Sequence, residues 1–298
     1  MIFESNVMSL LPQLIVDALL LSGLYTLMAI GLSLSFGVTR LINFAHGEAI
    51  MLGAYGSFWF LTLWGIDPLI SMPLLLALGF AGGFLMFKIS LERVLTAQHE
   101  NQILLTFGIG LILQNVAVIM WSGDQRSANP PYAFSSFEIG DVVIPGGRLI
   151  GFFVAAVVFG GLMWWLLRTE LGRACRALAE NRTAATLMGI DVHLTYAIAF
   201  GISTSLGVAT GVVMSFIMGI GPFMGFHMLV KGFAIIILGG LGSVTGTVIG
   251  AFTLGFAETI VGYYVPDGNG WAEGVAFALL FCILIVMPRG IRGQAVEE

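Results

Sequence analysis

The side chains that could carry chemistry in this sequence are few and scattered. Carboxylates occur inside apolar stretches at Asp17, Glu48 and Glu258, and His46 precedes Glu48 by two positions. An acid within an apolar segment is costly unless it is paired or hydrated, so each is a candidate for a solute or ion pathway. The histidines and cysteines have no spacing typical of a metal site, and no Ser-His-Asp arrangement can be argued. Passage of a solute is therefore favoured over covalent chemistry.

The lysines exclude one route to nucleotide hydrolysis. A phosphate-binding P-loop needs a Gly-Lys-Ser/Thr step. The only lysines are Lys88 and Lys231, and they follow Phe87 and Val230. We expect the chain itself to bind no nucleotide, metal or other cofactor, so any dependence on ATP must come from a partner.

One polar string, Asn43 to Glu48, opens an apolar stretch. Asn43 suits the N-cap of a helix, where its side chain accepts a hydrogen bond from an unpaired backbone N–H. Glu48 would then lie one turn into the helix, with His46 as its candidate partner. Two interpretations stay open: the cluster fixes the start of the helix, or His46, Gly47 and Glu48 line a gate or pathway together with Asn43.

A second candidate pathway segment is the apolar stretch 229–262, which Gly239, Gly240 and Gly242 interrupt. Non-helical backbone at membrane depth is tolerated only where protein or a water-filled cavity surrounds it. The stretch is predicted to form two short spans or a re-entrant hairpin. Glu258 is assigned with equal weight to the pathway and to the outer interface.

Membrane-spanning helices must position these residues. Of 298 residues, 58% are hydrophobic and only 10% are charged, whereas about one quarter are charged in a soluble domain. Forty glycines suit close helix packing in lipid, and the net charge of -5 argues against a nucleic-acid partner. The predicted fold is all-α: one polytopic membrane domain over residues 1–298.

Stretches of about twenty apolar residues predict the crossings. The predicted spans are 10–36, 44–64, 69–88, 102–121, 148–167, 193–219 and 271–288. With 229–262 they give eight or nine crossings. Gln114 and Asn115 fall deep in the fourth span, where hydrogen bonding to a neighbouring helix is expected.

Small residues recur at every fourth position in two of these spans. The two stripes are Ala45-Ala49-Gly53-Ser57 and Ser203-Gly207-Gly211-Ser215-Gly219. Such stripes let helix backbones approach closely, so tight helix interfaces are favoured over a direct role in transport.

Lysine and arginine predict the orientation. With the C-terminus inside, the inner loops carry nine of them: Arg40, Lys88, Arg93, Arg168, Arg173, Arg176, Arg182, Arg289 and Arg292. Arg126, Arg148 and Lys231 remain on the other face. Loop 168–192 is then cytoplasmic and, with its helix formers and a glycine stop at Gly189, is predicted to be helical. Loop 122–147 is external, and its alternating patch 137–144 predicts a small hairpin.

Three segments resemble the permeases of branched-chain amino acid ABC importers, the LivH branch. They are Leu-Ile-Asn-Phe-Ala-His-Gly-Glu at 41–48, the loop 176–191 and the glycine-rich run 238–246. The resemblance covers nearly the whole chain. It implies a multi-pass protein of a bacterial or archaeal cytoplasmic (inner) membrane that works with a second, LivM-like permease chain. It also implies two ABC ATPase subunits, which bind ATP and Mg, and a periplasmic or extracellular solute-binding protein.

The resemblance assigns the cytoplasmic loop to ATPase coupling. Its small residues match the pattern that lets a short helix sit in a cleft of an ATPase, whose movement then passes to the attached spans. The coupling residues implied are Arg176, Glu180, Arg182, Ala184, Ala185, Gly189 and Asp191.

The solute implied by the resemblance is leucine, isoleucine or valine. Related permeases carry urea, amides or small aromatic acids, so these form an alternative. A gradient-driven secondary transporter or channel is a second alternative, although Asp17, Glu48 and Glu258 are few for an ion relay. An intramembrane enzyme ranks lower, because no paired-acid motif or metal site is visible.

Overall fold

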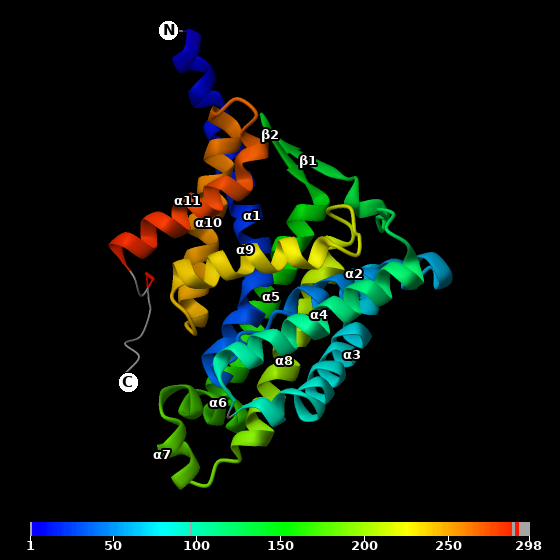
Figure 1. Ribbon diagram of the computed structural model, residues 1–298. Coiled ribbons are helices and arrows are strands. Elements are labelled where there is room, and N and C mark those ends of the chain that lie inside the picture. Colours follow the sequence, from blue (N-terminus) through cyan, green and yellow to red (C-terminus); the bar gives the residue numbers. More distant parts are fainter. Residues whose placement is uncertain (1, 96, 288–289, 292–298) are drawn as a thin grey trace.

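The computed structural model describes residues 2–95, 97–287 and 290–291. The described chain is helical apart from its loops and one two-stranded sheet (Figure 1). The main helices are α1 (Ile2–Thr39), α2 (His46–Trp64), α3 (Pro68–Ile89), α4 (His99–Trp121), α5 (Gly146–Arg168), α6 (Glu170–Glu180), α7 (Arg182–Leu187), α8 (Val192–Met214), α9 (Met224–Gly239), α10 (Val244–Tyr264) and α11 (Ala272–Val286). Short 3₁₀ turns occupy Leu91–Val94, Pro131–Ala133 and Gly268–Trp271, and the strands are β1 (Ser136–Ile139) and β2 (Val142–Pro145).

The predicted multi-pass membrane architecture is confirmed. Within the described ranges, six helices are long and apolar enough to cross a bilayer: α1, α3, α4, α5, α8 and α10. Helices α9 and α11 are apolar but have only 16 and 15 residues. The total of eight or nine crossings stays a prediction.

Most predicted spans end within a few residues of an observed helix, and one does not. The span predicted as 193–219 is wrong at its end, because α8 stops at Met214. The chain then leaves the helix to pair with the loop 122–147: Ala128 N–H donates to Ser215 O (2.8 Å), and Arg126 and Ile220 exchange two backbone hydrogen bonds. The apolar pattern continues past 214, but backbone pairing decides the helix end.

The stretch 229–262 forms two helices and a sharp turn. Helix α9 begins earlier than predicted, at Met224, and α10 follows after residues 240–243. Gly240 and Gly242 have φ values of 102° and 81°, which side chains rarely adopt. The glycines therefore end one helix and start the next.

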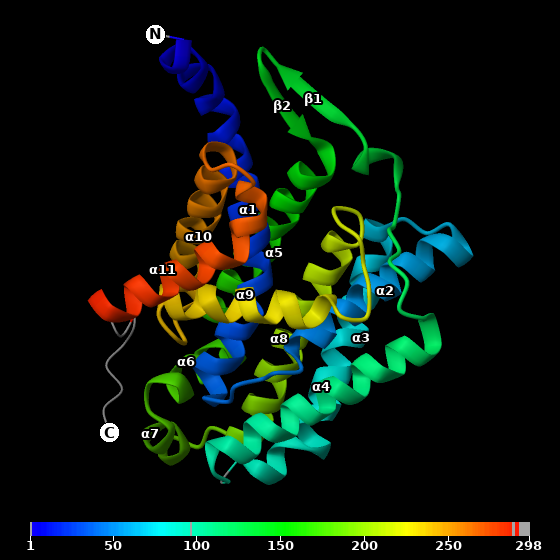
Figure 2. The same cartoon turned by 45° about the horizontal axis from the view of Figure 1, so that its top comes forward.

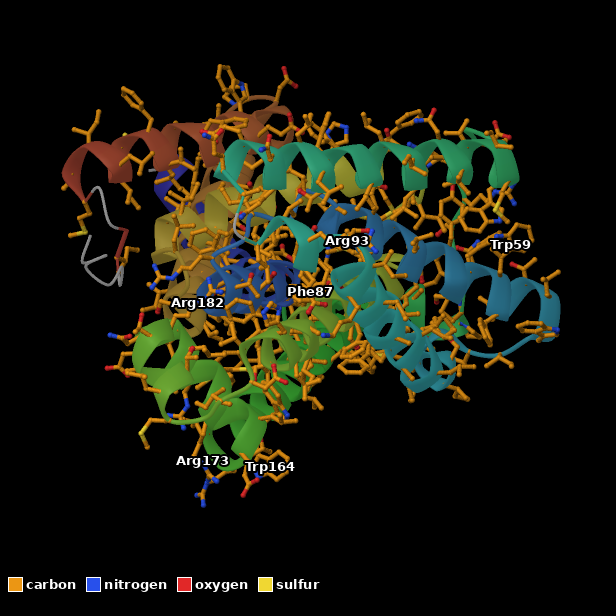
Figure 3. The ribbon with its side chains drawn as sticks, turned by 60° about the horizontal axis from the view of Figure 1, so that its bottom comes forward. Trp59, Phe87, Arg93, Trp164, Arg173 and Arg182 are labelled. Carbon is orange, nitrogen blue, oxygen red and sulfur yellow. The ribbon has the colours of Figure 1, made fainter. Side chains whose placement is uncertain are left out.

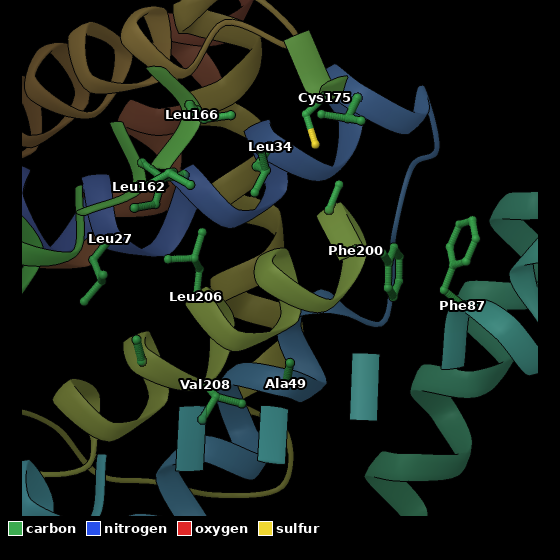
Figure 4. Close-up of a cluster of buried hydrophobic side chains, with 14 of the residues drawn as sticks. Leu27, Leu34, Ala49, Phe87, Leu162, Leu166, Cys175, Phe200, Leu206 and Val208 are labelled. Carbon is green, nitrogen blue, oxygen red and sulfur yellow. The ribbon is translucent and has the colours of Figure 1, made fainter. Parts of the chain in front are cut away.

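Helix α8 lies at the centre and packs against α1, α2 and α3. The two small-residue stripes face each other at the α2–α8 contact: Ser57 Oγ lies 3.1 Å from Ser215 Oγ, and a Cβ at Gly53 would be 2.8 Å from Val208 Cα. The two stripes thus form the two sides of one tight interface. Gly219 lies beyond the end of α8. Figure 4 shows the adjoining core, where α1, α5 and α8 contribute leucines.

The two long loops lie at opposite ends of the molecule (Figures 1 and 2). The predicted hairpin is confirmed as β1 and β2, with Phe137 opposite Ile144 and a turn at Gly140. The loop 168–192 contains α6 and α7, as predicted. Arg289 and Arg292, two of the nine basic residues predicted to lie on the inner side, are outside the described residues.

Candidate functional site: the loop 168–192 and buried polar clusters

Three side-chain caps define the helices of loop 168–192. Thr169 accepts from Gly172 N–H (3.0 Å) at the start of α6, and Asn181 accepts from Ala184 N–H (2.9 Å) at the start of α7. Asp191 accepts from Leu194 N–H (3.0 Å) and so begins α8. Each cap satisfies a backbone donor that the first helical turn leaves unpaired. Asp191, predicted as part of the coupling surface, thus also has this structural task.

The loop has a buried face and an exposed tip. Cys175 and Leu178 are buried in the core, and Ala185 is 4% exposed. Burial raises the pKa of the Cys175 thiol to about 12. At the tip, Leu187 and Met188 are each 84% exposed. The sequence analysis predicted the small residues of this loop as its contact surface and missed Leu187 and Met188. The available signal was two large apolar residues directly before Gly189.

The predicted basic residues of the loop hold it to the rest of the chain. Arg176 Nε donates to Leu166 O (3.1 Å), and the Arg182 guanidinium lies 5.7 Å from the ring centre of Tyr196. Arg40, at the end of α1, donates to Ala179 O (3.1 Å). Figure 3 shows Arg182 and Arg173 on the helices of this end. These contacts tie the loop to α5, to α8 and to the end of α1.

A cavity of about 220 Å³ lies beneath this loop. Glu180 and Arg182 line it together with Arg40. Ala184, Gly189 and Asp191 are exposed, as a docking surface requires. Of the other predicted coupling residues, Ala185 faces inward, and Arg176 bonds to α5 and does not line the cavity.

Asn43 does not cap α2, contrary to the sequence prediction. Its Oδ1 accepts from Ala45 N–H (3.0 Å) in the turn before the helix, and Ala45 is the N-cap residue. The same turn contacts α4, where Phe44 N–H donates to Thr106 Oγ1 (3.2 Å). Asn43 therefore shapes the turn that ties the start of α2 to α4.

His46 and Glu48 lie in different packing environments and do not pair. The His46 ring packs against α1 and α8, where a Cβ at Gly31 would be 2.6 Å from its Cε1. The Glu48 side chain lies beside Gly225 of α9. Positions i and i+2 of a helix point in different directions, which explains the separation. Both side chains are buried, and neither the two His46 nitrogens nor Glu48 Oε2 make a hydrogen bond of normal geometry within the described chain.

The predicted gate glycines lie at crossings of helices. A Cβ at Gly47 would be 2.6 Å from the carbonyl carbon of Gly225, and one at Gly239 would be 2.7 Å from Thr247 N. Gly242 packs on Gly37, at the end of α1. These contacts give Gly47, Gly239 and Gly242 a packing role; a gating role stays a prediction.

Glu258 belongs to a buried charged cluster that joins three helices. Lys231 Nζ of α9 lies 3.2 Å from Glu258 Oε2 of α10, and it donates to Tyr25 OH of α1 (2.8 Å). The Tyr25 hydroxyl donates to the same Glu258 oxygen. Sequence reasoning missed Lys231 and Tyr25 as partners. The available signal was a lysine inside an apolar stretch.

Two other polar residues of the predicted spans, Asp17 and Asn115, have clear contacts in the structure. Asp17 accepts from Tyr263 OH (2.6 Å) and Gln13 Nε2 (3.0 Å) at the hairpin end of the molecule, close to Arg148. Asn115 was expected to bond to a neighbouring helix, which is wrong within this chain. Its amide donates to Leu111 O of its own helix (2.7 Å), and the side chain is exposed.

Comparison with solved structures supports the fold. The chain resembles a chain of PsaBC from Streptococcus pneumoniae in complex with Fab, with a TM-score of 0.50, 14% identity and 97% of each chain covered. Such low identity supports similarity of fold alone.

Comparison of sequences identifies the family. The chain is 33% identical over 302 residues to the high-affinity branched-chain amino acid transport system permease protein BraD of Pseudomonas aeruginosa, covering 96% of this chain and 97% of BraD. It is 32% identical to LivH of Escherichia coli, covering 96% of each chain. It is 29% identical to a probable LivH of Methanocaldococcus jannaschii. Residues 14–284 match the family described as branched-chain amino acid transport system / permease component. The chain therefore belongs to this family of transport permeases.

Proposed function

We propose that this chain is the membrane-spanning permease subunit of an ABC importer for branched-chain amino acids. The observation that carries the proposal is the family match over residues 14–284, which includes the charged cluster and the coupling loop. The permease moves the solute and leaves hydrolysis to partners. ATP and Mg are bound by separate ATPase subunits, and this chain needs no cofactor of its own.

Two ATPase subunits serve the importer, and we infer that one docks at the tip of the α6–α7 loop. What supports this is the exposure of Leu187 and Met188 at 84% each, beside Ala184 and Gly189. Large apolar side chains on a polar loop are expected where another protein covers them. The hydrogen bond of Arg40 to this loop would pass a movement of the ATPase to α1.

A second, LivM-like permease chain covers one side of this one in the proposed importer. Helices α4, α9 and α11 lie along that side (Figures 2 and 3). Helix α4 is the least buried of the six long apolar helices. It presents the exposed amide of Asn115, and an exposed polar group is costly in hydrocarbon. A second chain would cover this surface and complete a pathway between the two permeases.

The hairpin end is assigned to the outside, where a periplasmic or extracellular solute-binding protein delivers the solute. Phe137 and Ile139 of β1 are 54% and 69% exposed, which supports a contact with another protein there. We propose nine crossings, with α2, α9 and α11 completing the six longer helices. The N-terminus is then outside, and the chain lies in a bacterial or archaeal cytoplasmic membrane.

Uptake into proteoliposomes tests the proposed function. The chain is purified with its second permease and ATPase subunits, and labelled leucine is supplied with the binding protein. Uptake that requires ATP inside the vesicle and survives collapse of ion gradients is expected. Uptake driven by an ion gradient without ATP would contradict the proposal.

A further inference from the structure

Lys231 lies where two cavities meet at the exposed side of α9. One cavity, of about 500 Å³, is lined by the loops after α4 and α8 and by the start of α11. The other, of about 390 Å³, lies between α9 and α11. Three residues line both: His227, Lys231 and Glu273. A cation and an anion therefore border a space large enough for a small solute.

The hydrogen-bonding groups of the cluster are only partly used. A lysine ammonium has three donors; Tyr25 OH and Glu258 Oε2 accept from two of them, and no third partner exists within the described residues. Glu258 Oε1 is buried and also lacks a partner in the described part of the chain. A buried polar group without a partner is costly. The cluster thus has one donor and one acceptor to spare.

The rim of the larger cavity carries the opposite charge. Glu273 begins α11, and its side chain is 65% exposed. His227 Nδ1 lies 3.5 Å from Glu273 Oε1, one helical turn before Lys231. The cavity therefore presents an ammonium group and, at another point of its wall, an exposed carboxylate beside His227.

One part of the wall of the larger cavity suits an apolar side chain. Met218, Met224 and Met228 line the larger cavity together with Phe223. Methionine is flexible and adapts to ligands of slightly different shape. An apolar wall between one positive and one negative group matches an amphiphilic zwitterion better than a neutral solute or an ion.

We propose that Lys231 and Glu273 form a recognition site for the zwitterionic backbone of an α-amino acid. The Lys231 ammonium donates to the α-carboxylate of the solute, and Glu273 accepts from its α-ammonium group. The methionines contact its aliphatic side chain. Glu258 and Tyr25 act as positioning residues that hold the Lys231 ammonium. This proposal rests on the proposed importer function. It assigns recognition of the solute to one part of the pathway.

The test separates recognition from simple structural pairing. In the complete reconstituted importer, Lys231→Met/Glu258→Gln removes both charges without leaving one buried alone. Leucine uptake should fall about tenfold or more, as expected when a charge-assisted hydrogen bond is lost. The matched control is Lys88→Met/Glu92→Gln, an ion pair of the same 3.2 Å separation at the end of α3, which should leave uptake near wild type.

A charge swap gives the decisive comparison. Lys231→Glu/Glu258→Lys keeps an ion pair but moves the cation to α10. If Lys231 binds the solute, the swapped complex should assemble, respond to loaded binding protein in ATPase activity and still import leucine about tenfold more slowly. Restored uptake would show a purely structural pair and overturn the proposal, as would wild-type uptake by Glu273→Gln. If the wild-type complex itself imports no leucine, the importer function fails instead.

Discussion

Gly211 of α8 lies against Ile50 of α2 so closely that a side chain at this position has no room. A Cβ there would overlap the Ile50 carbonyl oxygen and come within 2.6 Å of Ala54 N. These groups are backbone atoms and cannot rotate away. Contact at this distance makes the α2–α8 crossing a rigid part of the molecule, and it positions His46 and Glu48 on either side of α2.

Gly211→Ala should therefore destabilise the permease. Overpacking a tight core costs about 1–3 kcal/mol, which outweighs the gain of about 1 kcal/mol in helix propensity. Gly82→Ala on α3 is the control, because a Cβ there meets nothing within 4 Å. Thermal unfolding in detergent should show a lower midpoint for Gly211→Ala and no loss for Gly82→Ala. Equal midpoints would contradict the packing described.

The exposed tip of the loop 168–192 gives a second prediction. Leu187→Ser/Met188→Ser should weaken binding of the ATPase subunit by at least about tenfold, because a buried side chain of this size contributes about 1.5–3 kcal/mol. Leu171→Ser, a single-site control at a partly exposed leucine of the same loop, should leave co-purification unchanged. The assay is the amount of ATPase recovered with the tagged permease. Undiminished recovery with the double variant would place the docking site elsewhere.

Gly189 follows α7 in the left-handed region, with φ of 84°, and a Cβ at this position would meet nothing within 4 Å. Substitution is disfavoured by backbone strain and not by a clash, at about 1–2 kcal/mol for a side chain other than asparagine. Gly189→Asn should retain most uptake, whereas Gly189→Arg should lose ATPase association and uptake. Equal activity of the two variants would show that the loop needs no left-handed residue.

Cys175 provides a chemical test of the buried face of this loop. Its thiol is fully buried, and its pKa is raised to about 12. Below that pH the thiol stays protonated, and the thiolate is the reactive form. Alkylation at a pH of about 8 should therefore be slow in the folded permease and fast after denaturation. In a Cys282→Ser background, Leu187→Cys should react rapidly, and equally rapid labelling of native Cys175 would contradict the burial.

Much of the fold could be predicted from the sequence, because lipid imposes simple rules on it. Long apolar runs, the stripes beside Gly53 and Gly211, and the alternation at 137–144 are local patterns with one physical interpretation each. The end of α8 at Met214 could not be predicted, since the apolar pattern continues to Ile220, whose backbone pairs with Arg126. That partner comes from a distant loop of the chain.

The candidate site was less predictable for the same reason. The pairing of His46 with Glu48 looked plausible from their closeness in sequence, yet helix geometry turns them apart. Glu258 looked isolated because its partners, Tyr25 and Lys231, lie on two other helices. Contacts between helices decide such clusters, and a single sequence does not contain them in any local pattern.

In the proposed function, this permease couples ATP hydrolysis in partner subunits to import of a branched-chain amino acid. The most direct measurement is the ATPase rate of the reconstituted complex with and without binding protein loaded with leucine. Clear stimulation by the loaded binding protein is expected, together with loss of that stimulation in Leu187→Ser/Met188→Ser. A fully assembled complex whose ATPase rate ignores the loaded binding protein, while leucine enters along an ion gradient, would contradict it.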